Sequence, residues 1–207
     1  MRPLPRLHAI TDAVVLAAPD LGIRAAAIAA AGPAVALHAR DRSASGAVLT
    51  AAARRLMALA RPPEASVFVN ARPDIAAALG AQGLQLGAED LTAEDARGIF
   101  PQGWIGRSVH SPSEAARAVE EGADFLLVGS VFRSGSHPDR PAVGLDLVRE
   151  TASLGRPVIA IGGIDPARAP EVRDAGAYGV AAISALWRAP DSAAAALALL
   201  QPWLDAS

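Results

Sequence analysis

The sequence predicts a protein of the α/β class that folds as a single-domain (β/α)8 barrel, or TIM barrel. Strand-like apolar runs alternate with helical stretches along all 207 residues. The runs within 157–164 and 176–185 are rich in β-branched and small apolar residues, as parallel strands buried on both faces require. No change in composition marks a second domain, so residues 1–207 are interpreted as one domain.

The strand–helix units can be assigned in order along the chain. We expect strands at 7–11, 34–38, 66–70, 83–86, 104–108, 124–128, 157–164 and 176–183. We expect the principal helices at 21–31, 46–60, 73–79, 92–99, 113–121, 145–153, 166–175 and 192–204. An open doubly wound sheet is the alternative, but it would usually carry fewer strands and a glycine-rich first turn. Here the first strand ends in Thr11-Asp12, which favours the barrel.

Composition excludes several classes of chemistry and partner. The net charge of -2 provides no basic field for nucleic acid, and the absence of Cys removes thiolate nucleophiles and Cys-ligated metals. All 19 basic residues are Arg, so Schiff-base catalysis, which needs a lysine amine, is impossible. No apolar run reaches the roughly 18 residues of a membrane span, and the N-terminus lacks a signal-peptide core. We therefore expect a cytoplasmic protein with neither a membrane nor a nucleic-acid partner; a homo-oligomer is compatible with the sequence.

The ends of the last two strands predict a phosphate site. Gly162-Gly163 follows the seventh strand and Ile183-Ser184 the eighth, where a barrel commonly binds phosphate through backbone N–H groups. Gly144 is added to this set as a third glycine position near the same corner. Tight turns that need glycine for geometry alone are the alternative, but the pairing of the two loops favours a small phosphate ester as the ligand.

The carboxyl ends of the other strands are polar, and chemistry in such barrels lies at these ends. The candidate substrate-binding residues are Thr11, His38, Arg40, Asn70, Gln85 and Ser108. For Asn70, Gln85 and Ser108, a role as buried polar groups that satisfy loop backbone is equally compatible with the sequence. Asp12 and Asp90 could be N-caps of the helices that follow them.

Several motifs resemble the thiamine phosphate synthase/TenI superfamily across nearly the whole chain. They are His8-Ala-Ile-Thr-Asp12, Val69-Asn70, Leu84-Gln-Leu-Gly-Ala-Glu-Asp90, Ile105-Gly-Arg-Ser-Val-His-Ser111, Ala123-Asp124 and Val128-Gly-Ser-Val-Phe132, with the two phosphate motifs. The resemblance implies a role in thiamine biosynthesis, with thiazole phosphate as the small-molecule partner. Synthases of this family join a pyrimidine pyrophosphate to that thiazole phosphate.

The chain departs from the synthase pattern where pyrophosphate and magnesium bind. The pattern Gln-x-Arg-x-Lys is replaced by Ala36-Leu-His38-Ala-Arg40, and the Asp that follows Asn70 in synthases is Ala71. The loop after the sixth strand ends at His137 where synthases carry Lys. The resemblance therefore implies no cofactor and no metal, with Mg²⁺ needed only if the chain is a synthase and Asp90 as its one candidate ligand.

These departures favour the TenI branch and predict an isomerase that aromatises a thiazole phosphate. The branch carries a catalytic His at the position of Ser130, so another His must supply the proton transfer. His137 is our first candidate and His110 the second, while His8 is interpreted as structural. A divergent thiamine phosphate synthase, a transferase, is the alternative, and a non-catalytic protein that binds a phosphate ester is a second one.

Overall fold

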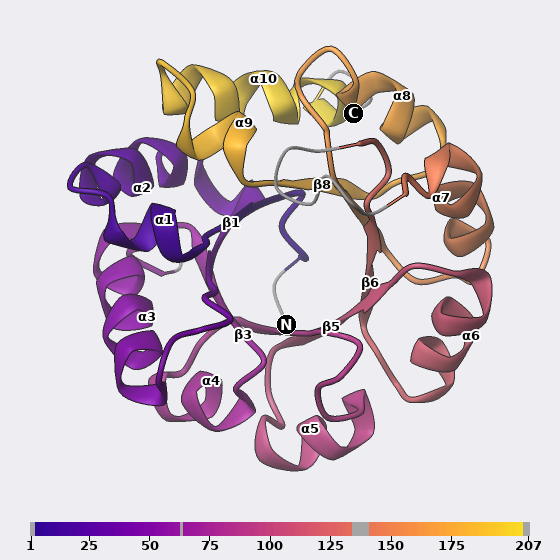
Figure 1. Ribbon diagram of the computed structural model, residues 1–207, viewed down its shortest axis with the longest axis horizontal. Coiled ribbons are helices and arrows are strands. Elements are labelled where there is room, and N and C mark those ends of the chain that lie inside the picture. The colour runs from indigo at the N-terminus through magenta and orange to yellow at the C-terminus, as the bar shows by residue number, and fades with distance from the viewer. Residues whose placement is uncertain (1–2, 63, 134–140, 205–207) are drawn as a thin grey trace.

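Eight parallel strands close into a barrel in chain order, from β1 beside β2 round to β8 beside β1 (Figure 1). The structure is a computed structural model that describes residues 3–62, 64–133 and 141–204. The strands are β1 Leu7–Ile10, β2 Val35–Ala39, β3 Ser66–Asn70, β4 Gly83–Leu86, β5 Trp104–Val109, β6 Phe125–Gly129, β7 Val158–Ile161 and β8 Gly179–Ala182. The predicted barrel is confirmed.

Helices form a ring around the strands (Figure 1). They are α1 Ala13–Ala17, α2 Leu21–Ala29, α3 Gly46–Ala60, α4 Pro73–Leu79, α5 Ala93–Ile99, α6 Pro112–Glu120, α7 Gly144–Ala152, α8 Ala169–Asp174, α9 Ser184–Trp187 and α10 Ser192–Leu204, with a 3-10 turn η1 at Gly32–Ala34. The expected positions of α3, α4 and α10 match the structure at both ends. Side chains on alternate strand positions face these helices and form the larger apolar core.

Two elements differ from the expectation. Helix α1 was not predicted; it begins after Asp12, whose Oδ1 accepts a hydrogen bond from the Val15 backbone N–H. Helix α8 begins at Ala169 rather than at Pro166, because the chain first makes a turn in which Asp165 accepts the Arg168 N–H. Pro170 then occupies the first turn of the helix, where a missing N–H costs nothing.

The inside of the barrel has its own smaller core. Phe68 and Phe125 fill it, at 0% exposure, and each ring lies over a strand glycine. A Cβ on Gly83 would come within 2.4 Å of the Phe68 ring, and one on Gly106 within 2.1 Å of the Phe125 ring. Glycine at these two positions is therefore required by packing. The strands are closed around solid side-chain packing, and any ligand must bind at an end of the barrel.

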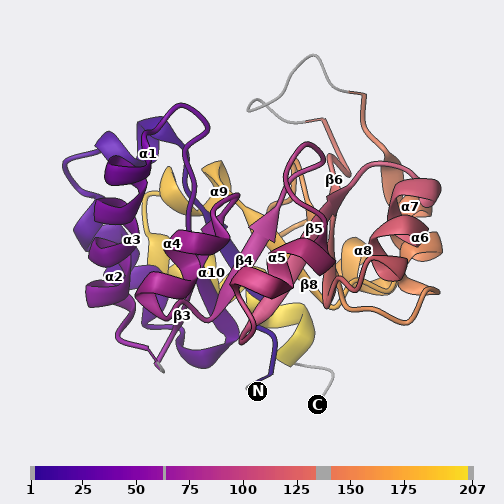
Figure 2. The same cartoon turned by 90° about the horizontal axis from the view of Figure 1, so that it is seen from below.

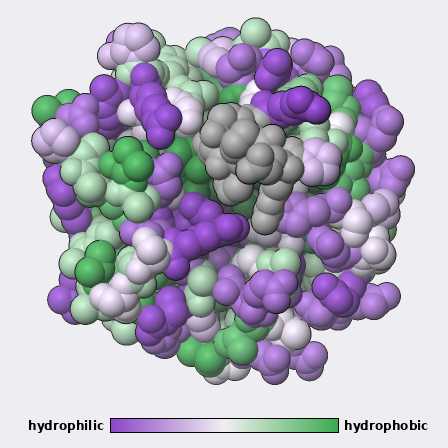
Figure 3. Space-filling view, in the orientation of Figure 1, coloured by the Kyte–Doolittle hydropathy of each residue, from purple (hydrophilic) through white to green (hydrophobic). Residues whose placement is uncertain are grey.

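Seen from the side, the segment before β1 and the last turns of α10 lie at the same end of the barrel (Figure 2). The face seen down the barrel is a mosaic of hydrophilic and hydrophobic residues without one dominant apolar area (Figure 3). Among the described residues, no helix combines the length and the apolar character needed to cross a bilayer.

Candidate functional site

The loops after β7 and β8 present free backbone N–H groups at one corner of the barrel. Within the described residues, no hydrogen-bond acceptor is found for the amides of Gly162, Gly163, Ile183 or Ser184. The two strands are neighbours in the sheet, with Ile161 in register with Ala181, so both loops leave the same edge. Unpaired N–H groups gathered at a strand edge are suited to binding an anion.

Glycine at this corner is also demanded by the backbone. Gly162 and Gly163 have φ values of 105° and 62°, which side chains rarely adopt. A Cβ on Gly162 would lie 2.3 Å from Ser130 Oγ, and one on Gly163 would lie 2.5 Å from the Arg133 carbonyl oxygen. The guanidinium of Arg168 donates to the Gly163 carbonyl oxygen at 2.7 Å, which ties the turn to the start of α8. Gly144 differs from these residues because its N–H already donates to Val131 O at 3.1 Å.

Arg40 follows β2, which is two strands from β8 in the barrel order, and supplies a cation at the carboxyl ends of the strands. Its guanidinium makes no hydrogen bond to a described residue, although the side chain is half-buried. Burial and the positive charge of Arg42 lower the pKa of Arg40, since both disfavour the charged form. The guanidinium nonetheless stays protonated, so an anion bound beside it would relieve this unfavourable environment.

Two predicted substrate-binding residues lie in the protein interior. Thr11 is fully buried, and its hydroxyl contacts the backbone of His38 and Arg40, where it joins β1 to β2. His38 is also fully buried, and burial lowers its pKa to about 4. A strand alternates its side chains between inside and outside, so His38 faces the barrel interior although it stands close to the strand end. The prediction that Thr11 and His38 contact substrate is therefore corrected.

Asn70 lies at the end of β3, half-buried, with one amide atom 3.0 Å from His38 Nδ1. Gln85 on β4 is 2% exposed, and its amide nitrogen donates to Leu86 O at 3.0 Å and to Ser108 Oγ at 3.1 Å. The Oε1 atom of Gln85 is buried without a hydrogen-bond partner among the described residues. The structure thus brings Gln85 and Ser108 together as a pair across β4 and β5.

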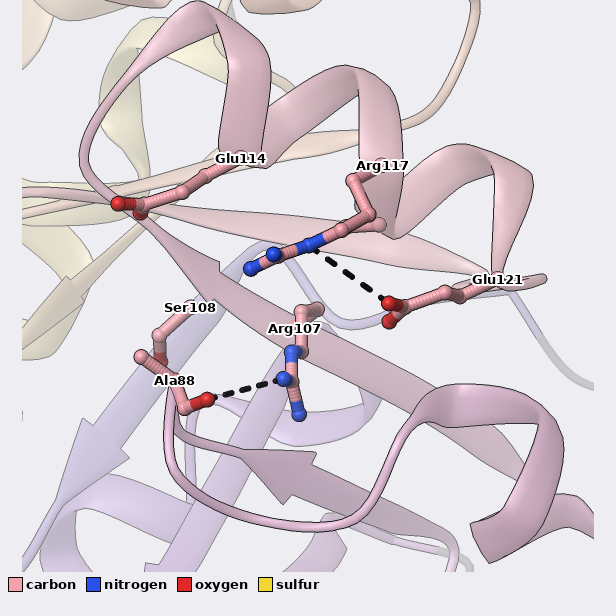
Figure 4. Close-up of a pocket in the computed structure, with 7 residues that line it drawn as sticks. Ala88, Arg107, Ser108, Glu114, Arg117 and Glu121 are labelled. Carbon is pink, nitrogen blue, oxygen red and sulfur yellow. Dashed lines mark hydrogen bonds and ion pairs between the residues drawn. The ribbon is translucent and has the colours of Figure 1, made fainter.

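The loop between β4 and α5 is held by Arg107, which sequence reasoning did not single out. The Arg107 side chain is buried, and its guanidinium donates to the carbonyl oxygens of Ala88 at 3.1 Å and Leu91 at 2.6 Å (Figure 4). Asp90 lies in this loop, and its Oδ2 accepts the Gly87 N–H at 2.6 Å. Asp90 thus caps its own loop, while the N-cap of α5 is Thr92. The sequence carries no specific signal for this contact, because its partners are backbone carbonyl oxygens, which any loop supplies.

The described side chains do not fit a magnesium site built by this chain alone. No group of three His, Asp or Glu residues able to hold a metal occurs in the described ranges. Ala71 offers no carboxylate, and its N–H donates to Gln85 O at 2.9 Å. Asp90 is the remaining carboxylate of the expected pair, whereas Mg²⁺ demands near-octahedral oxygen coordination.

Of the three residues predicted at the catalytic position, namely His137, His110 and Ser130, His137 lies outside the described residues. Ser130 follows β6, half-buried, and its carbonyl oxygen accepts the Val143 N–H at 2.8 Å. His110 lies beyond β5, where its Nδ1 contacts Gly129 O and its backbone N–H donates to Glu114 Oε2 at 2.7 Å. These contacts give His110 the part of a link between the loops after β5 and β6.

Comparison with known proteins places the chain among thiamine-forming enzymes. The profile of a family described as "Thiamine monophosphate synthase" matches residues 7–186. A curated Thiamine-phosphate synthase from Thermus thermophilus is 49% identical over 147 residues, covering 70% of this chain and 71% of the relative. One from Methanoculleus marisnigri is 42% identical over 177 residues, covering 84% of each protein.

Solved structures agree with these relatives. The structure of thiamine phosphate pyrophosphorylase from Pyrococcus furiosus has a TM-score of 0.83 at 36% identity, covering 97% of this chain and 96% of that one. A 3-hexulose-6-phosphate synthase structure has a TM-score of 0.69 at 19% identity over 95% of this chain and 99% of that one, a likeness of fold alone.

The prediction of a TenI-like thiazole tautomerase is wrong. Relatives at 42–49% identity carry the name thiamine-phosphate synthase, which was the alternative reading. The error came from weighing departures at Ala36, Ala71 and His137 above the agreement of the remaining chain. Such positions act through side chains, and other cations, Arg40 among them, can carry charge to the same region.

Proposed function

The chain belongs to the thiamine monophosphate synthase family, and we propose that it is a transferase joining a hydroxymethylpyrimidine pyrophosphate to a thiazole phosphate. The observation that carries this proposal is the identity of 49% and 42% to two curated thiamine-phosphate synthases over most of both chains. The geometry of the barrel opening supports it with two separate places for anions, as a reaction between two phosphorylated molecules needs.

We propose the β7–β8 corner as the site of the thiazole phosphate. Within the described residues, the amides of Gly162, Gly163, Ile183 and Ser184 have no acceptor and can donate to the ligand, beside the Arg168 guanidinium that binds the Gly163 carbonyl oxygen. Backbone donors fixed by strands cost little reorganisation when the ligand binds. Backbone amides do not titrate and Arg stays protonated, so the affinity of these groups for the phosphate should vary little with pH above the second phosphate pKa, about 6 for such monoesters.

We propose that Arg40 binds the pyrophosphate of the second substrate. In the reaction, the bond from the pyrimidine methylene carbon to pyrophosphate breaks as a bond to the thiazole forms, and the negative charge leaves with the pyrophosphate. A guanidinium with no other fixed partner can pair with two phosphate oxygens at once, which stabilises the developing charge. We propose that Ser108, which accepts a hydrogen bond from the buried Gln85 on the neighbouring strand, helps to orient the rings between the two anions.

The proposal is tested by incubating the full chain with both substrates and following pyrophosphate release and thiamine phosphate by chromatography. We expect both products in equal amounts, and none when either substrate is omitted. Binding of thiazole phosphate without pyrophosphate release would overturn the synthase proposal while leaving the phosphate corner in place.

A further inference from the structure

Three polar side chains form a hydrogen-bonded chain through the apolar interior of the barrel. His8 Nε2 lies 3.0 Å from the carbonyl oxygen of Pro5, at the end where the chain enters the barrel. His8 Nδ1 lies 2.8 Å from His38 Nε2, and His38 Nδ1 lies 3.0 Å from the amide of Asn70 at the opposite end of the strands. Both imidazoles are fully buried, and both rings pack against Phe68. The synthase proposal assigns no task to this chain of contacts.

The carbonyl oxygen of Pro5 fixes the direction of the whole series. A carbonyl oxygen only accepts, so His8 Nε2 must carry the proton. Burial and then the neighbouring His38 hold the pKa of His8 well below its usual range, so its ring is neutral and has a single N–H. His8 Nδ1 is therefore an acceptor, and the proton between the two rings belongs to His38 Nε2.

The same logic reaches Asn70. With its proton on Nε2, the neutral His38 ring has an acceptor at Nδ1, and an acceptor needs a donor opposite. Asn70 Oδ1 lies against this nitrogen in the structure, which would set two acceptors face to face. An Asn amide turned by 180° keeps its shape while exchanging its oxygen and nitrogen, so the partners decide which atom faces His38.

We infer that His8 and His38 are positioning residues that hold Asn70 with its amide nitrogen toward His38 and its Oδ1 free for a bound molecule. The second amide atom of Asn70 makes no hydrogen bond to a described residue and is not among the buried unpartnered atoms, so it is accessible at the end of β3. A protein backbone carbonyl at one end of the barrel thus sets the hydrogen-bond polarity of a side chain at the other.

The consequence for ligand choice rests on the proposed function, whereas the orientation of Asn70 does not. A free Oδ1 accepts, so it favours a ring substrate that offers an N–H, such as an amino group, over one with a carbonyl at the same place. Had the amide faced the other way, the preference would be reversed. The buried histidine pair would in this way contribute to substrate selection without touching the substrate.

The orientation is tested by long-range ¹H–¹⁵N NMR of the full chain with ¹⁵N-labelled histidine at pH 7.5, where both rings are neutral. We expect His8 and His38 each to carry a proton on Nε2 and none on Nδ1. In Asn70→Asp the carboxylate can only accept, so Nδ1 of His38 should gain a proton. A proton on His38 Nδ1 in the unmodified protein would overturn the inference, whatever the enzymatic activity.

The positioning role is tested by comparing His8→Phe with Tyr178→Phe. His8→Phe removes the acceptor of the His38 proton and releases the amide of Asn70, so we expect KM for one substrate to rise about tenfold with a smaller change in kcat. Tyr178→Phe removes a 2.8 Å hydrogen bond to Leu4 O at the same end of the barrel and should leave KM unchanged. Equal effects of the two variants would contradict positioning, and the NMR measurement decides the orientation even if His8→Phe does not fold.

Discussion

Two sides of the barrel opening differ in what they are made of. At the β7–β8 corner the donors are backbone amides, and the sequence contributes glycines that let the chain adopt positive φ and approach Ser130 closely. On the side of β2, β3 and β4 the polar groups are side chains: Arg40, Asn70, Gln85 and Asp90. Asn70, Gln85 and Asp90 are each held by a hydrogen bond to a neighbour, and the neighbour of Asn70, His38, lies deep in the interior.

The difference explains why one side is easier to predict than the other. A backbone site survives most side-chain substitutions, because its donors are supplied by every residue except Pro. A side-chain site can lose individual ligands, as at Ala71, and still receive charge from another position such as Arg40. Departures from a family pattern on the side of β2, β3 and β4 are therefore weak evidence that the protein catalyses a different reaction.

The largest expected effect is the loss of phosphate affinity at the β7–β8 corner in Gly163→Ala. The added Cβ would lie 2.5 Å from Arg133 O and 2.9 Å from Phe132 Cβ, so the turn must move and the amides lose their alignment. We expect thiazole phosphate affinity to fall by a factor of about 10³, measured by calorimetric titration. Gly155→Ala is the matched control, since Gly155 has a φ of 75° and no atom within 4 Å of an added Cβ. Similar losses in both variants would show that strain at positive φ, and not the corner, is responsible.

The side formed by β2, β3 and β4 should instead lose stability in acid, because Asn70 on this side rests on the buried His38. Unfolded His has a pKa near 6.5, whereas burial lowers that of His38 to about 4, so the unfolded chain binds more protons between these values. Stability should be greatest above pH 6.5 and fall as the pH drops toward 4, by about 3 kcal/mol from His38 alone. His8 adds a loss of the same sign, because burial also lowers its pKa.

Chemical denaturation at a series of pH values between 4.5 and 7.5 measures this loss, and the same series on His38→Phe should show a shallower decline. His110→Gln is the comparison variant, since His110 is half-buried at the rim and its removal should leave the decline in place. A decline unchanged in His38→Phe would assign the acid sensitivity to other groups.

The sequence predicted the barrel, and most strand bounds to within one residue, because these follow from local patterns of apolar residues. It also indicated the turn at Gly162-Gly163, which follows a buried run directly, whereas phosphate binding at this turn stays a prediction. It named His38 as a substrate-binding residue, whereas the His38 side chain is buried inside the barrel. The sequence alone does not show which residue is the last inward-facing one of a strand, because a shift of one residue turns every side chain to the opposite face. It missed Arg107, whose partners are carbonyl oxygens of a loop, which any sequence would supply.

Removing Arg40, whose guanidinium makes no hydrogen bond to a described residue, gives the next effect in size. We expect Arg40→Ala to lower kcat/KM for the pyrimidine pyrophosphate by a factor of about 10², because a guanidinium paired with departing phosphate oxygens stabilises the transition state. Affinity for thiazole phosphate should be unchanged if the two sides are independent. Arg42→Ala is the control: Arg42 is exposed, and its positive charge disfavours the charged form of Arg40. A loss of thiazole phosphate affinity in Arg40→Ala would show that the two sides form one site.

The smallest expected effect tests whether activity depends on how Arg107 holds the loop between β4 and α5. Arg107→Met keeps much of the buried stem but removes the hydrogen bonds to Ala88 O and Leu91 O, so the loop with Asp90 should open more often. We expect kcat/KM to fall about tenfold, with faster hydrogen exchange confined to residues 87–91. Arg117→Met removes a neighbouring cation whose side chain is 62% exposed and lies 3.7 Å from Glu121 (Figure 4). Such an exposed pair contributes little, so this variant should match the unmodified enzyme in both measurements. If Arg107→Met shows faster hydrogen exchange yet keeps full activity, the loop stabilises the fold without helping to bind or orient the substrate. The polar groups of β2 to β5 that contribute to activity would then be Arg40, Asn70 and the Gln85–Ser108 pair.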